Sequence, residues 1–458
     1  MNTFARSRFA LGAAVLLLAS ALLFPGCSTN VPQGAGAPAA TSASQQVAHP
    51  SAARMESIHN FTGGDGSGPI GMVEAGRENI RRVHVEGVAM NGGDVNGDGV
   101  IFGLAPGKNG TWREQTLYAF RGSSSSDGSK PSRIKIIRQW SNASPAALVV
   151  TESGGTNSAG TLVALTPNSA GTLSERFLYS FGGPGDGAKP EGGLYVNAKG
   201  VVFGTTADGG YSGDGTVYRM QPRATGTYQE SVVHSFGYSD GAHPISTLIG
   251  DAKGDLYGTT LGGGPSGANG TVFRMQPAGS GYSEKVLYAF RGYPNDGSAP
   301  FSCVTRDGKG DLFGTTVEGG TMNYGTVYEL MPRGGGYTER IIWNFGVVAG
   351  DGAYPTGPVL ISTDGKIFGT TQQGGPGGVS QGVGTVYELT PSSSGYVETV
   401  YGLDGKNGAI PVAGLSIDAQ GRMYGTAVRG GKSNDGTVFL VGYTKNVAYG
   451  CEKGNPAP

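Results

Sequence analysis

The sequence has little charge, little cysteine and little helical periodicity. Only 15% of its 458 residues are charged, and 33 lysines and arginines stand against 34 aspartates and glutamates, a net charge of −1. No basic cluster stands out, so nothing would steer the chain to nucleic acid and we expect no such partner. Beyond residue 27, no stretch repeats its apolar residues at a convincing helical period, which argues against a helical fold.

Cysteine occurs at three positions only, Cys27, Cys303 and Cys451. In an exported protein Cys303 and Cys451 could pair, but their separation gives no disulfide framework, so the sequence leaves this bond open. The five histidines show no metal-ligand spacing with one another.

Residues 1–27 have the pattern of a secretory signal. A basic start with Arg6 and Arg8 precedes an uncharged apolar run over residues 11–24. The run ends in LFPGC, which resembles the lipobox of bacterial lipoproteins and implies cleavage before Cys27 and lipidation of its sulfur. Ser28 follows, and by the same resemblance suggests an outer-membrane lipoprotein anchored to the membrane through Cys27. Ordinary cleavage nearby, leaving a free thiol, is the alternative.

Residues 28–55 are rich in Ala, Ser, Pro, Gln and Gly and lack an apolar period, which predicts a disordered tether. We expect a folded domain over residues 56–442, a C-terminal tail over residues 443–458, and a monomer.

Glycine is abundant, with 85 residues, and much of it lies in a repeat. The string FGTTADGGYSGDGTVYRM begins at Phe203, and similar strings begin at Tyr257, Phe313, Phe368 and Tyr424, with two weaker copies before them. The glycine that opens the second half of each copy recurs roughly every 55 residues. These glycines are Gly99, Gly160, Gly215, Gly270, Gly325, Gly384 and Gly436.

Each repeat holds four short segments with period-2 alternation, bounded by turn residues, which predicts a four-stranded antiparallel meander. We name its strands a to d outward from the axis: strand a follows the DGxxP string, strand b is LYGTT, strand c is GTVYxLxP and strand d is YxExxLYxF. Seven such units predict an all-β fold, a seven-bladed β-propeller of four-stranded antiparallel blades. The N-terminal strand 56–61 is expected to complete the last blade and close the ring. The rival is the C-terminal string GYTKNVAYG from Gly442, which resembles GYVETVYG from Gly395.

The YGTTxxGG and GTVYxLxP strings resemble the GloVer repeat of bacterial exported proteins of the "choice-of-anchor" kind, over about residues 56–442. The resemblance implies export, an anchor and a propeller, and it implies no established activity. The layout of each unit is also similar in form to kelch repeats.

Asp94, Asn96 and Asp98 match the first half of a calcium loop, D-x-N-x-D-G. The twelfth position is Ala105, where an EF-hand has glutamate, so the alternative is a simple b–c hairpin with Asn-Gly and Asp-Gly turns. Calcium is the one cofactor that the sequence suggests.

In a meander, the d–a and b–c connections emerge on the same rim, where loops on a rigid scaffold carry function. This rim is expected to carry five tyrosines, together with Lys189, His243, Glu318 and Arg429. The tyrosines are Tyr211, Tyr238, Tyr293, Tyr324 and Tyr354. Tyrosines among small polar residues suit a glycan or a peptide, so the sequence favours a non-catalytic binding or scaffolding module with a glycan or protein ligand. The alternative is a propeller-fold hydrolase or lyase acting on polysaccharide, although no pair of carboxylates stands out.

Overall fold

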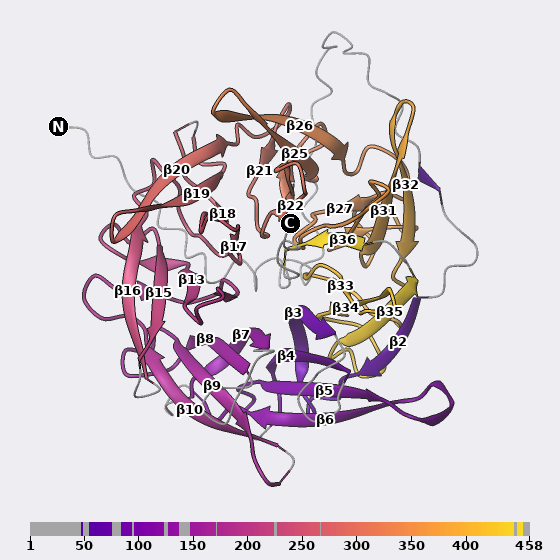
Figure 1. Cartoon of the computed structure of the whole chain (residues 1–458). Coiled ribbons are helices and arrows are strands. Elements are labelled where there is room, and N and C mark those ends of the chain that lie inside the picture. The colour runs from indigo at the N-terminus through magenta and orange to yellow at the C-terminus, as the bar shows by residue number, and fades with distance from the viewer. Residues whose placement is uncertain are drawn as a thin grey trace, which may run out of the picture. The chain divides into compact units, whose positions relative to one another are not determined.

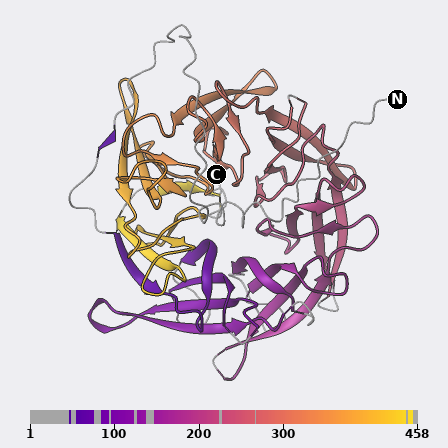
Figure 2. The same ribbon diagram turned by 180° about the vertical axis from the view of Figure 1, so that it is seen from behind.

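The computed structural model describes residues 47–48, 55–75, 84–93, 96–122, 127–136, 147–170, 172–223, 227–265, 267–443 and 447–451. The expected signal sequence with Cys27 and nearly all of the expected tether lie outside these residues. Within them the fold is a ring of seven four-stranded antiparallel blades, as the repeat predicts (Figure 1). The same circle of blades is seen from behind in Figure 2. No helix among the described residues has the length and apolar character needed to cross a membrane.

In each blade the strands run in order from the innermost, a, to the outermost, d. Blade 1 consists of β3 (Ser67–Ala75), β4 (Val85–Asn91), β5 (Val100–Pro106) and β6 (Trp112–Ala119), with the 3-10 turn η4 (Lys108–Gly110) before β6. Blade 2 consists of β7 (Ser129–Ile136), β8 (Ala147–Ser153), β9 (Thr161–Pro167) and β10 (Leu173–Ser180). Blade 3 consists of β12 (Tyr195–Val196), β13 (Val202–Thr206), β15 (Thr216–Pro222) and β16 (Tyr228–Ser235).

The remaining blades have the same order of strands. Blade 4 consists of β17 (Ile249–Gly250), β18 (Leu256–Thr260), β19 (Thr271–Ala278) and β20 (Gly281–Ala289). Blade 5 consists of β22 (Thr305–Arg306), β23 (Leu312–Thr316), β25 (Thr326–Arg333) and β26 (Gly336–Asn344). Blade 6 consists of β28 (Leu360–Ser362), β29 (Ile367–Thr371), β31 (Thr385–Ser392) and β32 (Gly395–Gly402). Blade 7 consists of β33 (Ser416–Ile417), β34 (Arg422–Ala427), β35 (Thr437–Tyr443) and β2 (Met55–Asn60).

The first strand of the propeller pairs with the last strand of its repeat. Strand β2 pairs with β35, from Met55 opposite Val441 to Asn60 opposite Thr437, so the N-terminal strand completes blade 7 and the prediction of ring closure is confirmed. The rival C-terminal segment forms β36 (Val447–Gly450), which pairs instead with the inner strand β28 of blade 6. At the outer edge of the same blade, β1 (Val47–Ala48) pairs in parallel with β32.

Cys451, directly after β36, forms a disulfide with Cys303 of blade 5. The structure thus settles the pairing that the sequence leaves open. The bond joins the end of the described chain to the inner part of the ring, where β36 lies in Figure 1.

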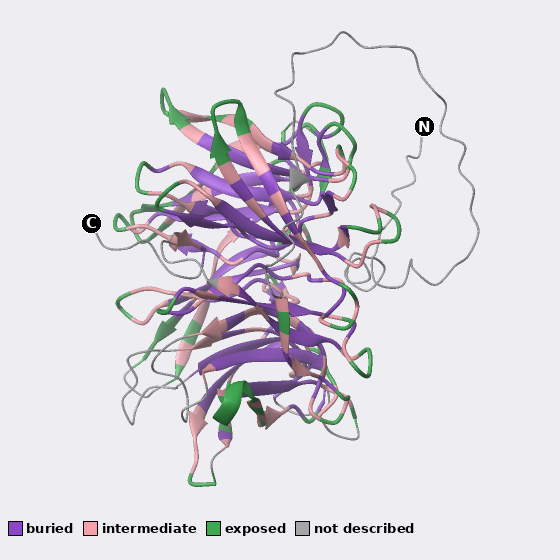
Figure 3. Ribbon diagram, turned by 90° about the vertical axis from the view of Figure 1, so that its right-hand side faces the viewer, coloured by how far each residue is buried: buried purple, intermediate pink, exposed green. Residues whose placement is uncertain are grey.

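The hydrophobic core lies between the blades. Buried side chains form seven clusters, and each cluster takes its members chiefly from two neighbouring blades. For example, Phe181 at the end of blade 2 packs edge-to-face on Tyr218 of blade 3, with ring centroids 5.0 Å apart. Burial therefore follows the strands, and exposed residues gather in the connecting loops (Figure 3). A rigid frame of this kind can present loops of varied sequence.

Candidate ligand-binding rim

The d–a turns and b–c loops lie on one side of the blades, and we call this surface the loop rim. The d–a turn that leads into a blade is called its entering turn. In blade 3 the entering turn contains β11 (Gly187–Ala188), which pairs with β14 (Asp208–Gly209) of the b–c loop. Two other blades repeat this pairing, through β21 (Gly297–Ser298) with β24 (Glu318–Gly319) and β27 (Gly352–Ala353) with β30 (Gln373–Gly374). The two kinds of connection are therefore neighbours, as the meander predicts.

Each entering turn also contacts the preceding blade, through a hydrogen bond and a packed proline ring. The backbone N–H of His243 donates to the carbonyl of Asp214 at 2.8 Å, and the ring of Pro244 packs against Gly215. The same hydrogen bond and the same proline–glycine contact occur at all seven junctions between blades. The glycine that marks the repeat is therefore needed for contact between blades.

The residue before this proline adopts the left-handed conformation in every blade, with φ near +55°. These residues are Gly68, Lys130, Lys189, His243, Ala299, Tyr354 and Ile410. Residues other than glycine rarely adopt this conformation, and a following proline normally favours an extended one. Because the frame imposes the backbone, the side chain at this position is not needed to hold it, and six residue types occur in seven blades.

A second position on the rim varies even more. It is the b–c loop residue that faces the entering turn in the strand register, as Asp208 faces Ala188. Its seven occupants are Asn91, Ser153, Asp208, Gly262, Glu318, Gln373 and Arg429. The loop rim thus carries two rows of side chains that differ from blade to blade.

The two rows meet in a charged cluster around blade 3. The Lys189 ammonium lies 2.6 Å from a carboxylate oxygen of Asp208. His243 Nδ1 lies 2.9 Å from the Ala207 carbonyl oxygen and 3.5 Å from the other Asp208 oxygen. Hydrogen bonds to Asp208 raise the pKa of both Lys189 and His243. Burial alone would raise the pKa of Asp208, but the bonds from His243 and Lys189 outweigh it and lower that pKa.

Two carboxyl groups, Glu152 and Glu191, belong to the same electrostatic cluster. Burial, followed by the nearby charge of Glu152, raises the pKa of Glu191 to about 7, and burial also raises the pKa of Glu152. Sequence reasoning missed this pair. An available signal was that Glu191 is the only charged residue to follow the rim proline in the seven copies of the repeat.

The five predicted tyrosines divide into two groups. Tyr211, Tyr238 and Tyr293 are 90%, 52% and 61% exposed, so their rings are open to solvent. Tyr324 and Tyr354 are half-buried and pack edge-to-face on each other at 5.5 Å. Glu318 and Arg429 are exposed on the rim.

The predicted calcium loop falls only partly within the described residues. Asp94 lies outside them, whereas Asn96 and Asp98 lie in the b–c loop of blade 1. The backbone carbonyl of Asp98 accepts the N–H of Lys130 at 2.9 Å, so this residue forms the blade 1 copy of the contact between blades. Calcium binding stays a prediction.

A small cavity is lined by residues in or shortly before the innermost strands of several blades, among them Met72, Ser246, Phe301 and Val412. Among the described residues that line it, Arg133 is the one charged side chain, and none is a carboxylate or a histidine.

These features define a β-propeller of tandem four-stranded blades, closed by its own N-terminal strand. The chain belongs to the Gloeobacter/Verrucomicrobia repeat family, whose model matches residues 84–300 and 266–449. No curated protein matches its sequence.

Two solved structures are similar in fold. One is PorZ, a bacterial surface component of the type-IX secretion system of Porphyromonas gingivalis, with 14% identity, a TM-score of 0.47, and coverage of 81% of this chain and 46% of PorZ. The other is the extracellular domain of the putative hybrid two-component system BT4673 from B. thetaiotaomicron, with 11% identity, a TM-score of 0.51, and coverage of 87% of this chain and 43% of that chain. This chain therefore spans less than half the length of either protein, and at such identity the similarity concerns the fold alone.

Proposed function

We propose that the protein is a non-catalytic extracytoplasmic binding or scaffolding module, held at the outer membrane by a lipid on Cys27. Its loop rim recognises a glycan or a peptide. The disulfide between Cys303 and Cys451 supports the location, since such bonds persist mainly outside the cytoplasm. The signal pattern of residues 1–27 points the same way.

The observation that carries this proposal is the contrast between constant and variable positions in the seven repeats. The glycine and proline that join the blades are the same in every copy, so they serve the frame. On the loop rim, the same backbone geometry presents side chains that differ in charge, size and polarity. A surface needed only for folding would not require different side chains in the seven blades. A surface that contacts an asymmetric ligand would require them.

The chemistry of the rim suits a polar ligand with flat faces. Tyr211 lies in the b–c loop of blade 3, which also carries Asp208, and Tyr238 lies in the d–a turn that follows this blade. Exposed tyrosine rings supply apolar contact area with a polar tip and lose little conformational entropy on binding. The neighbouring Lys189 and His243 supply hydrogen-bond donors for hydroxyl or carbonyl oxygens.

An array of glycans and peptides tests this proposal. We expect the parent protein to bind a subset of ligands, and a triple variant with Tyr211, Tyr238 and Tyr293 changed to alanine to lose at least about tenfold in affinity, because aromatic anchors dominate such surfaces. The control changes Lys199, Lys253 and Lys309 to alanine, since these exposed residues lie in a–b hairpins on the opposite side of the blades. No binding by the parent, or equal binding by the tyrosine variant, would refute the proposal.

One observation favours the second candidate, a polysaccharide hydrolase or lyase. Glu191, with its raised pKa of about 7, lies in a cluster with a second carboxyl group, as a general acid would require. Release of reducing or unsaturated ends from array glycans by the parent, and its loss in Glu191→Gln, would replace the binding proposal with the enzymatic one.

A further inference from the structure

A group of three side chains recurs at the junctions between blades, away from the variable rows of the loop rim. It consists of a residue near the end of strand d, the aspartate of the following DG turn, and a glutamate on strand d of the next blade; we call it the acid junction. The six copies are His59/Asp65/Glu114, Tyr118/Asp127/Glu175, Tyr179/Asp186/Glu230, His234/Asp240/Glu284, Tyr288/Asp296/Glu339 and Trp343/Asp351/Glu398. The junction between blades 6 and 7 has Tyr401, Asn407 and Met55 at these places.

Where tyrosine occupies the first position, its hydroxyl donates to the acids. Tyr179 Oη lies 3.0 Å from Asp186 and 3.5 Å from Glu230, so one phenol reaches both carboxyl groups. Tyr118 and Tyr288 donate to their aspartates at 2.6 and 2.8 Å. These junctions are structural hydrogen-bond groups.

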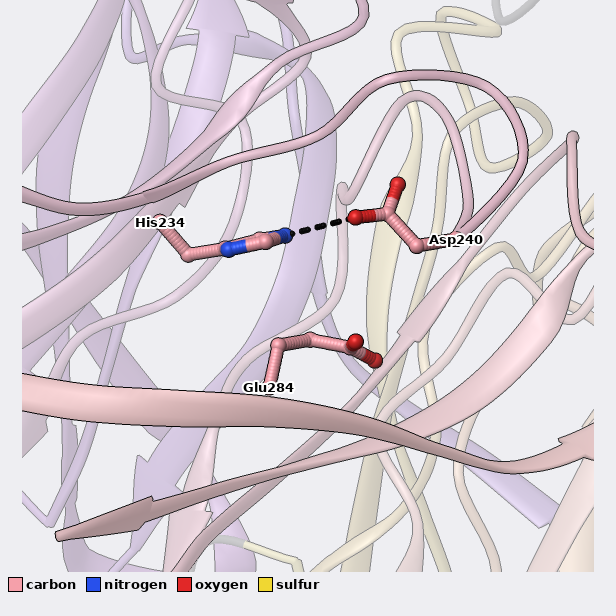
Figure 4. A group of neighbouring side chains, drawn as sticks. All are labelled: His234, Asp240 and Glu284. Carbon is pink, nitrogen blue, oxygen red and sulfur yellow. Dashed lines mark hydrogen bonds and ion pairs between the residues drawn. The ribbon is translucent and has the colours of Figure 1, made fainter. Parts of the chain in front are cut away.

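In the junction between blades 3 and 4, histidine replaces the phenol. His234 on β16 places Nε2 2.9 Å from Asp240 Oδ2, and Glu284 reaches toward the pair from β20 (Figure 4). One ligand atom of each residue lies within 4.8 Å of the other two. Glu284 Oε1 is buried and has no hydrogen-bond partner among the described residues, as is also true of Glu230 Oε1 and Glu339 Oε1 in two tyrosine junctions. The difference in this junction is the imidazole, which is a metal ligand, in place of a phenol.

We propose that His234, Asp240 and Glu284 bind a divalent transition-metal ion, with Zn²⁺ as the best match. One imidazole and two carboxylates are ligand types that zinc accepts, at about 2.0–2.2 Å. Those bond lengths place the ligand atoms of a tetrahedral site about 3.4 Å apart, and the three atoms already lie within 4.8 Å of one another. Side-chain rotations that move these atoms by at most about 1 Å would therefore complete the site.

Access and charge also fit an ion. The side chains of His234 and Asp240 are 22% and 28% exposed, which leaves an entry path from solvent. The three ligands carry two negative charges when the imidazole is neutral, and a dication compensates them. With three protein ligands the metal keeps a position for water or for a ligand atom. Asp240 is two residues from Tyr238, so the ion would also tie down a loop of the rim.

The other histidine junction, between blades 7 and 1, is arranged differently and serves as the matched control. His59 Nε2 lies 3.0 Å from Asp65, but Glu114 accepts a hydrogen bond from Thr116 at 3.2 Å. The other oxygen of Asp65 accepts from the backbone N–H and the hydroxyl of Thr62. An oxygen of each carboxylate is therefore already bonded within its own blade or turn, although His59 Nε2 has no hydrogen-bond partner among the described residues. Within the part of the chain that the structure describes, His234, Asp240 and Glu284 are gathered closely enough to hold a metal, and this second group is not.

Zinc titration of the metal-stripped full chain tests the proposal by calorimetry and by elemental analysis of the dialysed protein. We expect one tightly bound zinc per parent chain, and the same for His59→Tyr. His234→Tyr introduces the residue that the equivalent position has in the neighbouring blades, so the fold should be kept, and we expect at least a tenfold loss of affinity. Glu284→Gln should weaken binding similarly, because the amide is a poorer ligand.

Zinc binding of equal stoichiometry and affinity in parent and His234→Tyr would overturn the proposal, as would a parent chain that retains no zinc. Thermal unfolding of both variants without metal checks that a loss of binding is not a loss of fold.

Discussion

Gly215 shows how a single residue serves two blades. Its φ of +95° lies in the left-handed region, and a Cβ there would lie 2.4 Å from the Thr206 carbonyl oxygen and 2.6 Å from Pro244 Cδ. Conformation and space thus exclude a side chain for separate reasons. The sequence showed that the glycine recurs, but the contact with the proline of the next blade is visible only in the structure.

Gly215→Ala is expected to lower the free energy of unfolding by about 2–4 kcal/mol, because it combines left-handed strain with a clash between blades. Gly213→Ala is the matched control, since Gly213 has φ of +83° but a Cβ added there would meet no atom within 4 Å. It should lose only about 1 kcal/mol. Chemical denaturation measures both, and equal losses would show that the contact with Pro244 contributes nothing.

The threonine pair of the repeat, Thr205 and Thr206 in blade 3, ends strand b, and its hydroxyl groups have further roles. Thr206 shares a hydrogen bond with Thr216 of strand c at 2.8 Å, within the blade. Thr205 donates to the Ser246 carbonyl at 3.0 Å, in the next blade. β-Branched residues are predictable from strand propensity. The partner of Thr205 was not, because it is 41 residues away and depends on how blades pack.

At the scale of the blade, the alternating pattern predicted the strands and their number, because each strand pairs with its neighbour in sequence. The acid junctions were not predicted, since an aspartate from one turn meets a glutamate from the next blade. Burial, followed by the nearby charge of Asp186 and of Asp296 respectively, raises the pKa of Glu230 and of Glu339 to about 7.

These raised pKa values make the fold more stable in mild acid. Between about pH 4.5 and 7 the unfolded chain has released the protons of Glu230 and Glu339 while the folded chain still holds them. The stability that these two groups contribute is therefore fully present below pH 4.5 and is lost as the pH rises through 7. Each half-exposed carboxyl group should contribute on the order of 1 kcal/mol after solvent screening.

The double variant Glu230→Gln/Glu339→Gln removes this effect. We expect the parent to lose more stability than the variant between pH 5 and pH 8, measured by urea unfolding. If the free energy of unfolding varied with pH in the same way in both proteins, Glu230 and Glu339 would not be the source of the pH dependence.

At the scale of the whole molecule, the first and last segments of the propeller domain close the ring and stabilise it. Strand β2 closes blade 7 and the Cys303–Cys451 bond fixes the end of β36, so segments distant in sequence complete one circle. Closure was predictable because the repeat begins with a lone strand d and ends with a strand c. The place of β36 was not, since its sequence resembles a strand d but it pairs at the inner edge of blade 6. The charged cluster of Lys189, Asp208 and His243 could not be predicted either, because its residues come from separate turns and loops that only the fold brings together.

The most direct test of the account asks which surface a ligand covers. Hydroxyl-radical footprinting of the protein with the best array ligand should show protection at Tyr211, Tyr238 and Tyr293 on the loop rim. Protection on the a–b hairpins or on the outer strands, with these tyrosines still fully reactive, would contradict the claim that the variable rim is the recognition surface.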